Sequence, residues 1–253
     1  MNQISKLNEV TEAILKNKIA FDEDGKERKI DDAISRPEAY MLYKMVIAAQ
    51  PAVSIEVGLA FGISALVFCQ AHNDKKTMSE SIHYAVDPNQ LTFYRNTAIV
   101  SVKAAGLYKY LKVLNGPSHL EIPNLLKDNI VVDCAFVDGW HTFDYTFTDF
   151  FLIDKMLRPG GYIAFHDVYG RAKQKVINFI LTHRKYEIAE DLMEIESEPL
   201  VKTVKFFLWR LLRSPSLIFS WYHWKYQTKN SSGLLILRKK ENFEPNFDFF
   251  KNF

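Results

Sequence analysis

The chain has 253 residues, of which 48% are hydrophobic and 25% charged, and its net charge is +2. These values are typical of a globular protein with a sizeable core, and the overall charge gives no reason to expect nucleic-acid binding. The N-terminus does not resemble a signal peptide, and no segment has the ~20 apolar residues of a membrane-spanning helix. We therefore expect a cytoplasmic protein, in which Cys69 and Cys134 are reduced core residues and not parts of a disulfide or zinc site.

The first fifty residues predict a helical cap. The segment 21–29 is charged and contains a glycine, which indicates a loop. Ser35, Pro37 and Glu38 form the pattern of a capped helix start, and the apolar run 40–49 predicts the helix that follows.

From residue 51 onward, β-branched runs alternate with helical patterns. Strands are predicted at 53–58, 83–87, 109–116, 131–139, 162–167 and 232–240, with a turn at 158–161. Helices are predicted at 91–106, 118–127, 143–157 and 172–183, and Ser118 with Glu121 predicts a capping box. This alternation predicts an α/β fold of the Rossmann-like, doubly wound type, with a mostly parallel seven-stranded sheet and helices on both faces. The core spans 51–198, and 229–253 adds the last strand and the tail.

Segment 199–228 differs from the rest and is interpreted as an insertion before the last strand. Between Pro199 and Lys240 there are nine basic residues and no acidic one, and three of the four tryptophans lie there. The pattern predicts a basic amphipathic helix followed by an aromatic stretch. It is either packed on the core or on a second subunit of a homo-oligomer, a lid over a binding site, or an interfacial helix that contacts a membrane through 200–226. Nucleic acid is not expected, because no base-reading motif accompanies the charge.

One glycine motif follows the first core strand. In the run from Ile55 to Ser64, Glu56 precedes Gly58 by two residues, and Phe61, Gly62 and Ser64 lead into a helix. Glycine permits close ligand approach, and a helix N-terminus favours an anionic group. The G-x-G-x-x-G pattern of a dinucleotide site is absent. A purely structural turn would give the same pattern.

Three further segments follow strand ends. Asp87 ends the second core strand, where a carboxylate can accept the two ribose hydroxyls of a nucleoside or cap a helix. Ser118 follows the third strand and is either an adenine contact or a helix cap. Asp138-Gly139-Trp140-His141 ends the fourth strand, and His166-Asp167 ends the fifth.

In this order, these segments resemble the class I S-adenosylmethionine-dependent methyltransferases. More narrowly, they resemble the group of macrocin and cephalosporin-pathway O-methyltransferase-like proteins, with catechol and caffeoyl-CoA O-methyltransferases as more distant relatives. The resemblance covers about residues 36–185 and the last strand. It implies that S-adenosyl-L-methionine is held by Glu56 at its methionine end, by Asp87 at the ribose, and by the residues Gly58, Phe61, Gly62, Ser64, Ser118 and Asp138.

The resemblance also implies a divalent metal, Mg²⁺ or Mn²⁺, at Asp138, His166 and Asp167. His166 departs from the family's acidic or amide ligand and is interpreted as a ligand, a hydrogen-bond donor or a catalytic group. A capped acidic loop without a metal remains the alternative. His141 stands where the catechol-type enzymes carry a lysine base, and histidine can accept a hydroxyl proton near its ordinary pKa of ~6.5. The alternative is that His141 only hydrogen-bonds its loop.

The sequence therefore predicts transfer of a methyl group to a hydroxyl of a small molecule or sugar. Two hypotheses compete with it. One is a catalytically inactive methyltransferase-fold protein that binds a membrane or protein partner through the insertion. The other is an oxidoreductase, which the missing dinucleotide motif disfavours.

Overall fold

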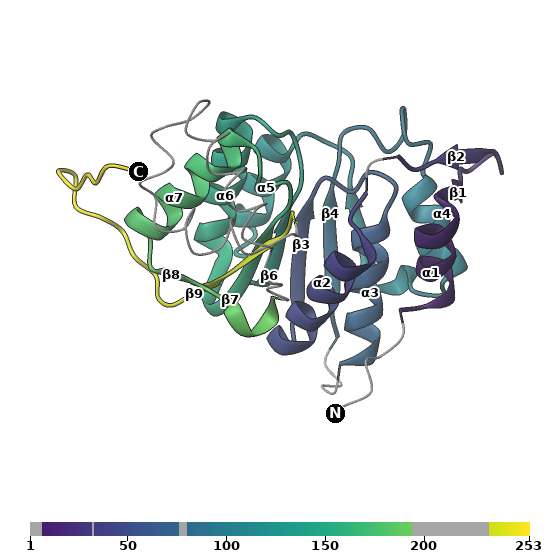
Figure 1. Cartoon of the computed structure of the whole chain (residues 1–253), viewed down its shortest axis with the longest axis horizontal. Coiled ribbons are helices and arrows are strands. Elements are labelled where there is room, and N and C mark those ends of the chain that lie inside the picture. The colour runs from purple at the N-terminus through teal and green to yellow at the C-terminus, as the bar shows by residue number, and fades with distance from the viewer. Residues whose placement is uncertain (1–6, 32, 76–79, 194–232) are drawn as a thin grey trace, which may run out of the picture.

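A seven-stranded sheet organises the part of the chain that the computed structural model describes, which is residues 7–31, 33–75, 80–193 and 233–253 (Figure 1). The strand order is β5-β4-β3-β6-β7-β9-β8. β3 to β7 run parallel, and β9 is antiparallel to both of its neighbours. The predicted Rossmann-like sheet is confirmed, whereas the insertion 199–228 lies outside the described residues. The strands are β3 (Val53–Val57), β4 (Ile82–Val86), β5 (Leu111–Leu114), β6 (Val132–Val137), β7 (Leu157–Phe165), β8 (Tyr186–Ile188) and β9 (Leu235–Lys239).

The helices form two packed groups. The first contains α2 (Arg36–Ala49), α3 (Ile63–Asp74) and α4 (Thr97–Ala104), and the second contains α5 (Ser118–Lys127), α6 (Phe143–Met156) and α7 (Arg171–His183). The strand order reverses at β3, so right-handed crossovers put the two groups on opposite faces of the sheet. Four phenylalanines are fully buried in the resulting core: Phe68, Phe136, Phe150 and Phe165.

Two further sequence-level expectations concern the core and the membrane. Cys69 and Cys134 are buried and unpaired, and burial raises the pKa of both thiols. None of the helices in the described ranges is long and apolar enough to cross a membrane.

The N-terminal region contains a hairpin as well as helices. Helix α1 (Glu9–Asn17) precedes β1 (Ile19–Phe21) and β2 (Glu27–Lys29), which pair antiparallel. The Asp22 carboxylate accepts hydrogen bonds from the backbone N–H groups of Asp24 and Lys26, both at 3.0 Å. The expected loop at 21–29 is therefore a tight turn whose flanks are strands.

The two predicted capping boxes have different outcomes. At α2, the Ser35 hydroxyl accepts from the Glu38 backbone N–H and the Glu38 carboxylate accepts from the Ser35 N–H, as expected. At α5, Pro117 is the N-cap and makes no side-chain cap bond. The capping box at Ser118 is wrong, because the extended backbone of Pro117 brings Ser118 into the first helical position.

Two predicted boundaries also move. Helix α4 starts at Thr97 and not at residue 91, because Arg95 and Asn96 have left-handed backbone angles that interrupt a helix. The predicted turn at 158–161 lies inside β7, where Gly160 has a φ of +78° and the pairing with β6 shifts register. The glycine makes an irregularity within the strand instead of ending it.

Candidate active site

The carboxyl ends of the central strands bring the selected residues to one edge of the sheet. β3 and β6 are neighbours although they are far apart in the chain. Chain progression reverses between them, and open α/β sheets bind their ligands in the crevice at such a point. The loops that follow β3, β4, β6 and β7 all begin at this edge.

The glycine loop after β3 is fixed by tight packing. Gly58 has a φ of +94°, and a Cβ added to it would lie 2.3 Å from the carbonyl oxygen of Asp138. Gly62 has a φ of +86°, and its added Cβ would lie 2.6 Å from the Ala98 Cβ. Both glycines are thus required by the fold, whatever ligand lies above them. Gly62 caps α3 without a side-chain hydrogen bond, so the N–H groups of the first turn have no capping side chain.

A narrow groove runs over this loop. Gly58, Phe61, Gly62 and Ser64 lie in its wall together with Asp138, so the structure brings together five selected positions from two separate motifs. Ala33 and Ile34, which precede α2, also line it, and no motif in the sequence indicates them. The full lining is Ala33, Ile34, Gly58, Leu59, Ala60, Phe61, Gly62, Ile63, Ser64 and Asp138.

Glu56 lies beneath the groove and is not part of its lining. Its side chain is fully buried, and Oε1 is 3.1 Å from Nε2 of His83, an equally buried residue in β4. The Ser54 hydroxyl links His83 Nδ1 (2.8 Å) to His72 Nε2 (2.6 Å). Burial lowers the pKa of His72 to about 3, which keeps its imidazole neutral. The carboxylate expected at the methionine end therefore belongs to a buried polar chain in this structure.

Asp87 ties two loops together at the end of β4. Its Oδ2 accepts a hydrogen bond from the Ala60 N–H at 2.8 Å, and its Oδ1 accepts one from the Asn89 N–H at 2.7 Å. Gln90 also donates to Oδ2, at 3.3 Å. The carboxylate thus holds the glycine loop against the loop after β4. The helix cap that the sequence left open beside ribose binding is wrong, because residues 88–96 form turns and not a helix.

Ser118 lies next to a buried carboxylate that the sequence did not select for a role. Asp149 in α6 is 1% exposed, and burial raises the pKa of its carboxyl to about 6. The neighbouring Ser118 opposes part of that shift, although neither carboxyl oxygen of Asp149 has a hydrogen-bond partner among the described residues. Asp149 is therefore partly protonated near neutral pH.

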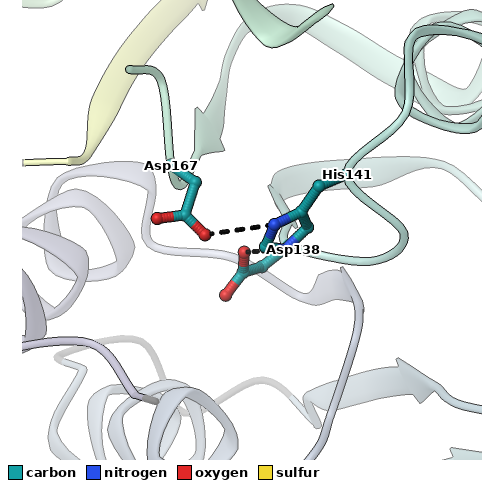
Figure 2. Close-up of side chains that lie close together, drawn as sticks. All are labelled: Asp138, His141 and Asp167. Atoms are coloured by element: carbon teal, nitrogen blue, oxygen red, sulfur yellow. Dashed lines mark ion pairs between the residues drawn. The ribbon is translucent and has the colours of Figure 1, made fainter. Parts of the chain in front are cut away.

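Asp138, His141 and Asp167 face one another across the ends of β6 and β7 (Figure 2). His141 Nδ1 is 3.4 Å from Asp167 Oδ2, and His141 Nε2 is 3.6 Å from Asp138 Oδ1. One ligand atom from each of the three lies within 4.8 Å of the others, which is a set that could hold a metal ion. Asp167 has a φ of +51°, a strained angle of the kind that concentrates at functional sites.

His166 occupies a more enclosed position among carboxylates. Its Nδ1 lies 3.3 Å from Asp138 and 3.5 Å from Asp167, and its Nε2 lies 3.5 Å from Glu38 of α2. Burial alone would lower the pKa of His166, but the three carboxylates outweigh it and raise the pKa to about 11. The ligand atoms that converge within 4.8 Å belong to Asp138, His141 and Asp167, so His141 stands in this set where the sequence put His166.

Glu38 and Lys173 also reach this cluster, and sequence reasoning missed both in that role. Glu38 was selected only as a helix cap, yet hydrogen bonds from His166 and Ser35 outweigh burial and lower its pKa to about 2. Lys173 in α7 is buried with its Nζ 3.4 Å from Asp138 Oδ1. In the sequence, Lys173 is one of several polar residues of an amphipathic helix, so nothing distinguishes it.

The fold and the site together define a class. A sheet of this order, a glycine loop after its first strand and an acidic residue at the end of the next strand are the features of S-adenosylmethionine-dependent methyltransferases. Residues 55–168 match the family model described as a methyltransferase domain. Over these residues the chain is therefore similar to methyltransferase domains, and its sheet has the Rossmann-like order of that fold.

Solved structures give the same fold at low sequence identity. The O-methyltransferase TomG from Streptomyces achromogenes, involved in tomaymycin synthesis and solved in complex with S-adenosylmethionine, is 14% identical, with a TM-score of 0.60 over 95% of this chain and 100% of that chain. An O-methyltransferase from Bacillus cereus in complex with S-adenosylhomocysteine is 13% identical, with a TM-score of 0.59 over 74% of this chain and 86% of that chain. The search among curated proteins gave no match.

Proposed function

We propose that this protein transfers the methyl group of S-adenosylmethionine to a hydroxyl of a small molecule or sugar. One observation carries the proposal: the groove over the glycine loop and the Asp138–His141–Asp167 cluster share Asp138. A donor held in the groove therefore has its reactive end beside groups that can activate an oxygen. The two structural relatives, both O-methyltransferases, support an oxygen acceptor.

The lining of the groove offers hydrogen-bond donors and a carboxylate to the methyl donor. S-adenosylmethionine supplies an electrophilic methyl group on a sulfonium centre. The first turn of α3 offers uncapped N–H groups for its carboxylate, and Ser64 lies in the same wall. Asp138 presents a carboxylate, and we assign Asp87 to the ribose and Ser118 to the adenine. We assign Glu56, a carboxyl group buried in β3 just before the glycine loop, to the cationic methionine end.

His141 is assigned as the base that takes the proton from the acceptor hydroxyl. Its side chain is 54% exposed, whereas that of His166 is 12% exposed, so only His141 is open to a substrate. The carboxylates of Asp138 and Asp167 flank the ring and stabilise it once it holds a proton. His166, as an imidazolium, orients the two carboxylates.

The donor set of the cluster fits a divalent cation. Two carboxylates and an imidazole converge within 4.8 Å, and oxygen ligands suit Mg²⁺ while an imidazole favours Mn²⁺. We assign Asp138 and Asp167 as ligands of the ion and His141 as the base. A bound cation would stabilise the substrate oxyanion.

Isothermal calorimetry with S-adenosylhomocysteine tests the donor site. Tight binding, with none for NAD, supports the proposal, and binding of neither would refute it.

Methyl transfer to a panel of hydroxylated acceptors then separates an enzyme from an inactive binding protein. Activity that is lost in EDTA and restored by Mg²⁺ or Mn²⁺ supports the metal assignment; full activity in a protein shown to contain no metal removes it.

Several finer assignments remain predictions. They are the macrocin-like subgroup, the cytoplasmic location and a homo-oligomeric state. Membrane contact through 200–226 also remains a prediction, and it lies outside the described residues.

A further inference from the structure

Lys173 is a buried cation at the edge of the proposed active site. Its side chain is 1% exposed, although it lies in a helix whose other lysine, Lys175, is partly exposed and donates to the Phe253 carbonyl at 2.7 Å. A buried ammonium is strongly destabilising unless an anion faces it. Among the described residues, the ion-pair partner of Lys173 is Asp138, at 3.4 Å from Nζ to Oδ1.

Asp138 is thereby held from two sides. Lys173 contacts Oδ1, while His166 Nδ1 approaches Oδ2 at 3.3 Å. The His141 Nε2 atom lies 3.6 Å from the same Oδ1 that Lys173 contacts. Lys173 also acts electrostatically on Asp167, but within the described residues Asp167 forms no ion pair with a lysine, and its side chain is 44% exposed. The two carboxylates of the cluster therefore differ in how closely the buried ammonium faces them.

This difference matters for any cation that enters the cluster. A divalent ion bound through Asp138 must share its carboxylate with an ammonium that cannot move into water without unpacking α7. Two positive charges within a few ångström repel each other strongly where water is excluded.

We propose that Lys173 is the built-in counter-cation of Asp138 and that it limits how tightly the Asp138–Asp167 pair binds a divalent cation. Lys173 is a positioning residue, because it acts through Asp138 and touches neither donor nor acceptor in this arrangement. The inference rests on the assignment of Asp138 and Asp167 to the ion under the proposed function.

The test is Mn²⁺ binding, followed by electron paramagnetic resonance of the free ion, with and without saturating S-adenosylhomocysteine. Lys173→Met removes the charge and keeps much of the length, and it should bind Mn²⁺ about tenfold or more tightly than the parent. Lys173→Arg keeps the charge and should resemble the parent. Lys175→Met removes a lysine charge from the same helix and should also leave binding unchanged.

Equal or weaker Mn²⁺ binding by Lys173→Met would overturn the proposal, and so would no Mn²⁺ binding by either protein. Circular dichroism must show that each variant is folded. If Lys173→Met does not fold, Lys173→Gln takes its place with the same expectation. Calorimetry with S-adenosylhomocysteine separates the two levels: donor binding with an unaltered metal affinity refutes the role of Lys173 alone, whereas loss of donor binding in the parent refutes the function.

Discussion

The two halves of the sheet edge use similar residues in opposite ways. On the β3–β4 side, Glu56 is fully buried and Asp87 is 4% exposed, and Asp87 already accepts three hydrogen bonds. On the β6–β7 side, the His141 and Asp167 side chains are 54% and 44% exposed, and their contact at 3.4 Å faces solvent. A carboxylate of the first half shapes the loops, whereas one of the second half is free to meet a ligand.

The reason lies in the loop after each strand. After β3 and β4 the loops pack against each other, since the Gly58 N–H bonds to Val86 and the Ala60 N–H bonds to Asp87. After β6 and β7, the contact between His141 and Asp167 is made by the imidazole ring itself. A motif residue is therefore best judged by the partners its polar atoms already have.

The largest expected effect is on the β6–β7 side, which we call the open half. His141→Ala should lower turnover by roughly 10²–10⁴-fold, the usual contribution of a general base. Affinity for S-adenosylhomocysteine should hardly change, because the imidazole lies on the acceptor side of Asp138. Steady-state rates on an active hydroxylated acceptor, with calorimetry of the donor product, measure both quantities.

A companion variant decides between the two histidines. His166→Ala should reduce thermal stability as well as rate, because it leaves three carboxylates facing one another without the imidazolium. An inactive His166→Ala beside a fully active His141→Ala would show that His166, and not His141, is the base.

The next effect concerns Asp149, a buried carboxyl group of α6 on the β6–β7 side, and it sharpens the comparison. The pKa of Asp149 is about 6 when folded, against an ordinary value of 3.8. The folded protein holds this proton more tightly than the unfolded chain, so the free energy of unfolding falls as pH rises from about 4 through 6 and then levels off. The loss is up to about 3 kcal/mol.

Asp149→Asn cannot ionise and should lack that fall with pH. Urea denaturation of both proteins between pH 4.5 and 8 measures it, with Asp144→Asn, exposed on the same helix, as the matched control. Parallel profiles for the parent and Asp149→Asn would mean that Asp149 is ionised throughout.

A smaller effect is expected at the glycine loop. Gly58→Ala introduces a Cβ that would lie 2.3 Å from the Asp138 carbonyl oxygen, at a φ of +94°. We expect unfolding to become easier by about 2 kcal/mol and donor binding to weaken, because the loop must shift. Gly25→Ala, at a positive φ with no atom near its added Cβ, separates backbone strain from the clash. Similar losses for both variants would mean that packing against Asp138 is unimportant.

The smallest effect is expected at the cap of α2, which joins the helix to the open half through Glu38. Ser35→Ala should cost about 1 kcal/mol of stability, the usual value of an N-cap serine. Turnover should fall slightly, since Glu38 also faces His166, and donor affinity should not change. Thermal melting and kinetics measure the two parts; a large loss of donor binding would contradict the separation of the two halves.

The sequence by itself determined the fold class and the edge of the sheet at which the site lies. Strand runs that end in Gly58, Asp87, Asp138 and Asp167 are local patterns, and parallel strands carry their carboxyl ends to one edge. These two facts are enough to bring the motifs together without knowledge of any side-chain contact. The Ser35 cap is local in the same way, because its two partners are three residues apart.

Only the tertiary structure decided which partner each polar group has. Glu38 belongs to no site motif, yet it accepts a hydrogen bond from Gly233, 195 residues away, and faces His166. Lys173 reaches Asp138 over 35 residues, and His83 faces Glu56 from the neighbouring strand β4. Such contacts depend on how helices pack on the sheet. The strength of a charge interaction changes with a few ångström of separation, and the periodicity of a sequence does not specify that separation. The same packing separates the two rings of the site, since it leaves His141 exposed and encloses His166 among carboxylates, a difference that residue type does not indicate.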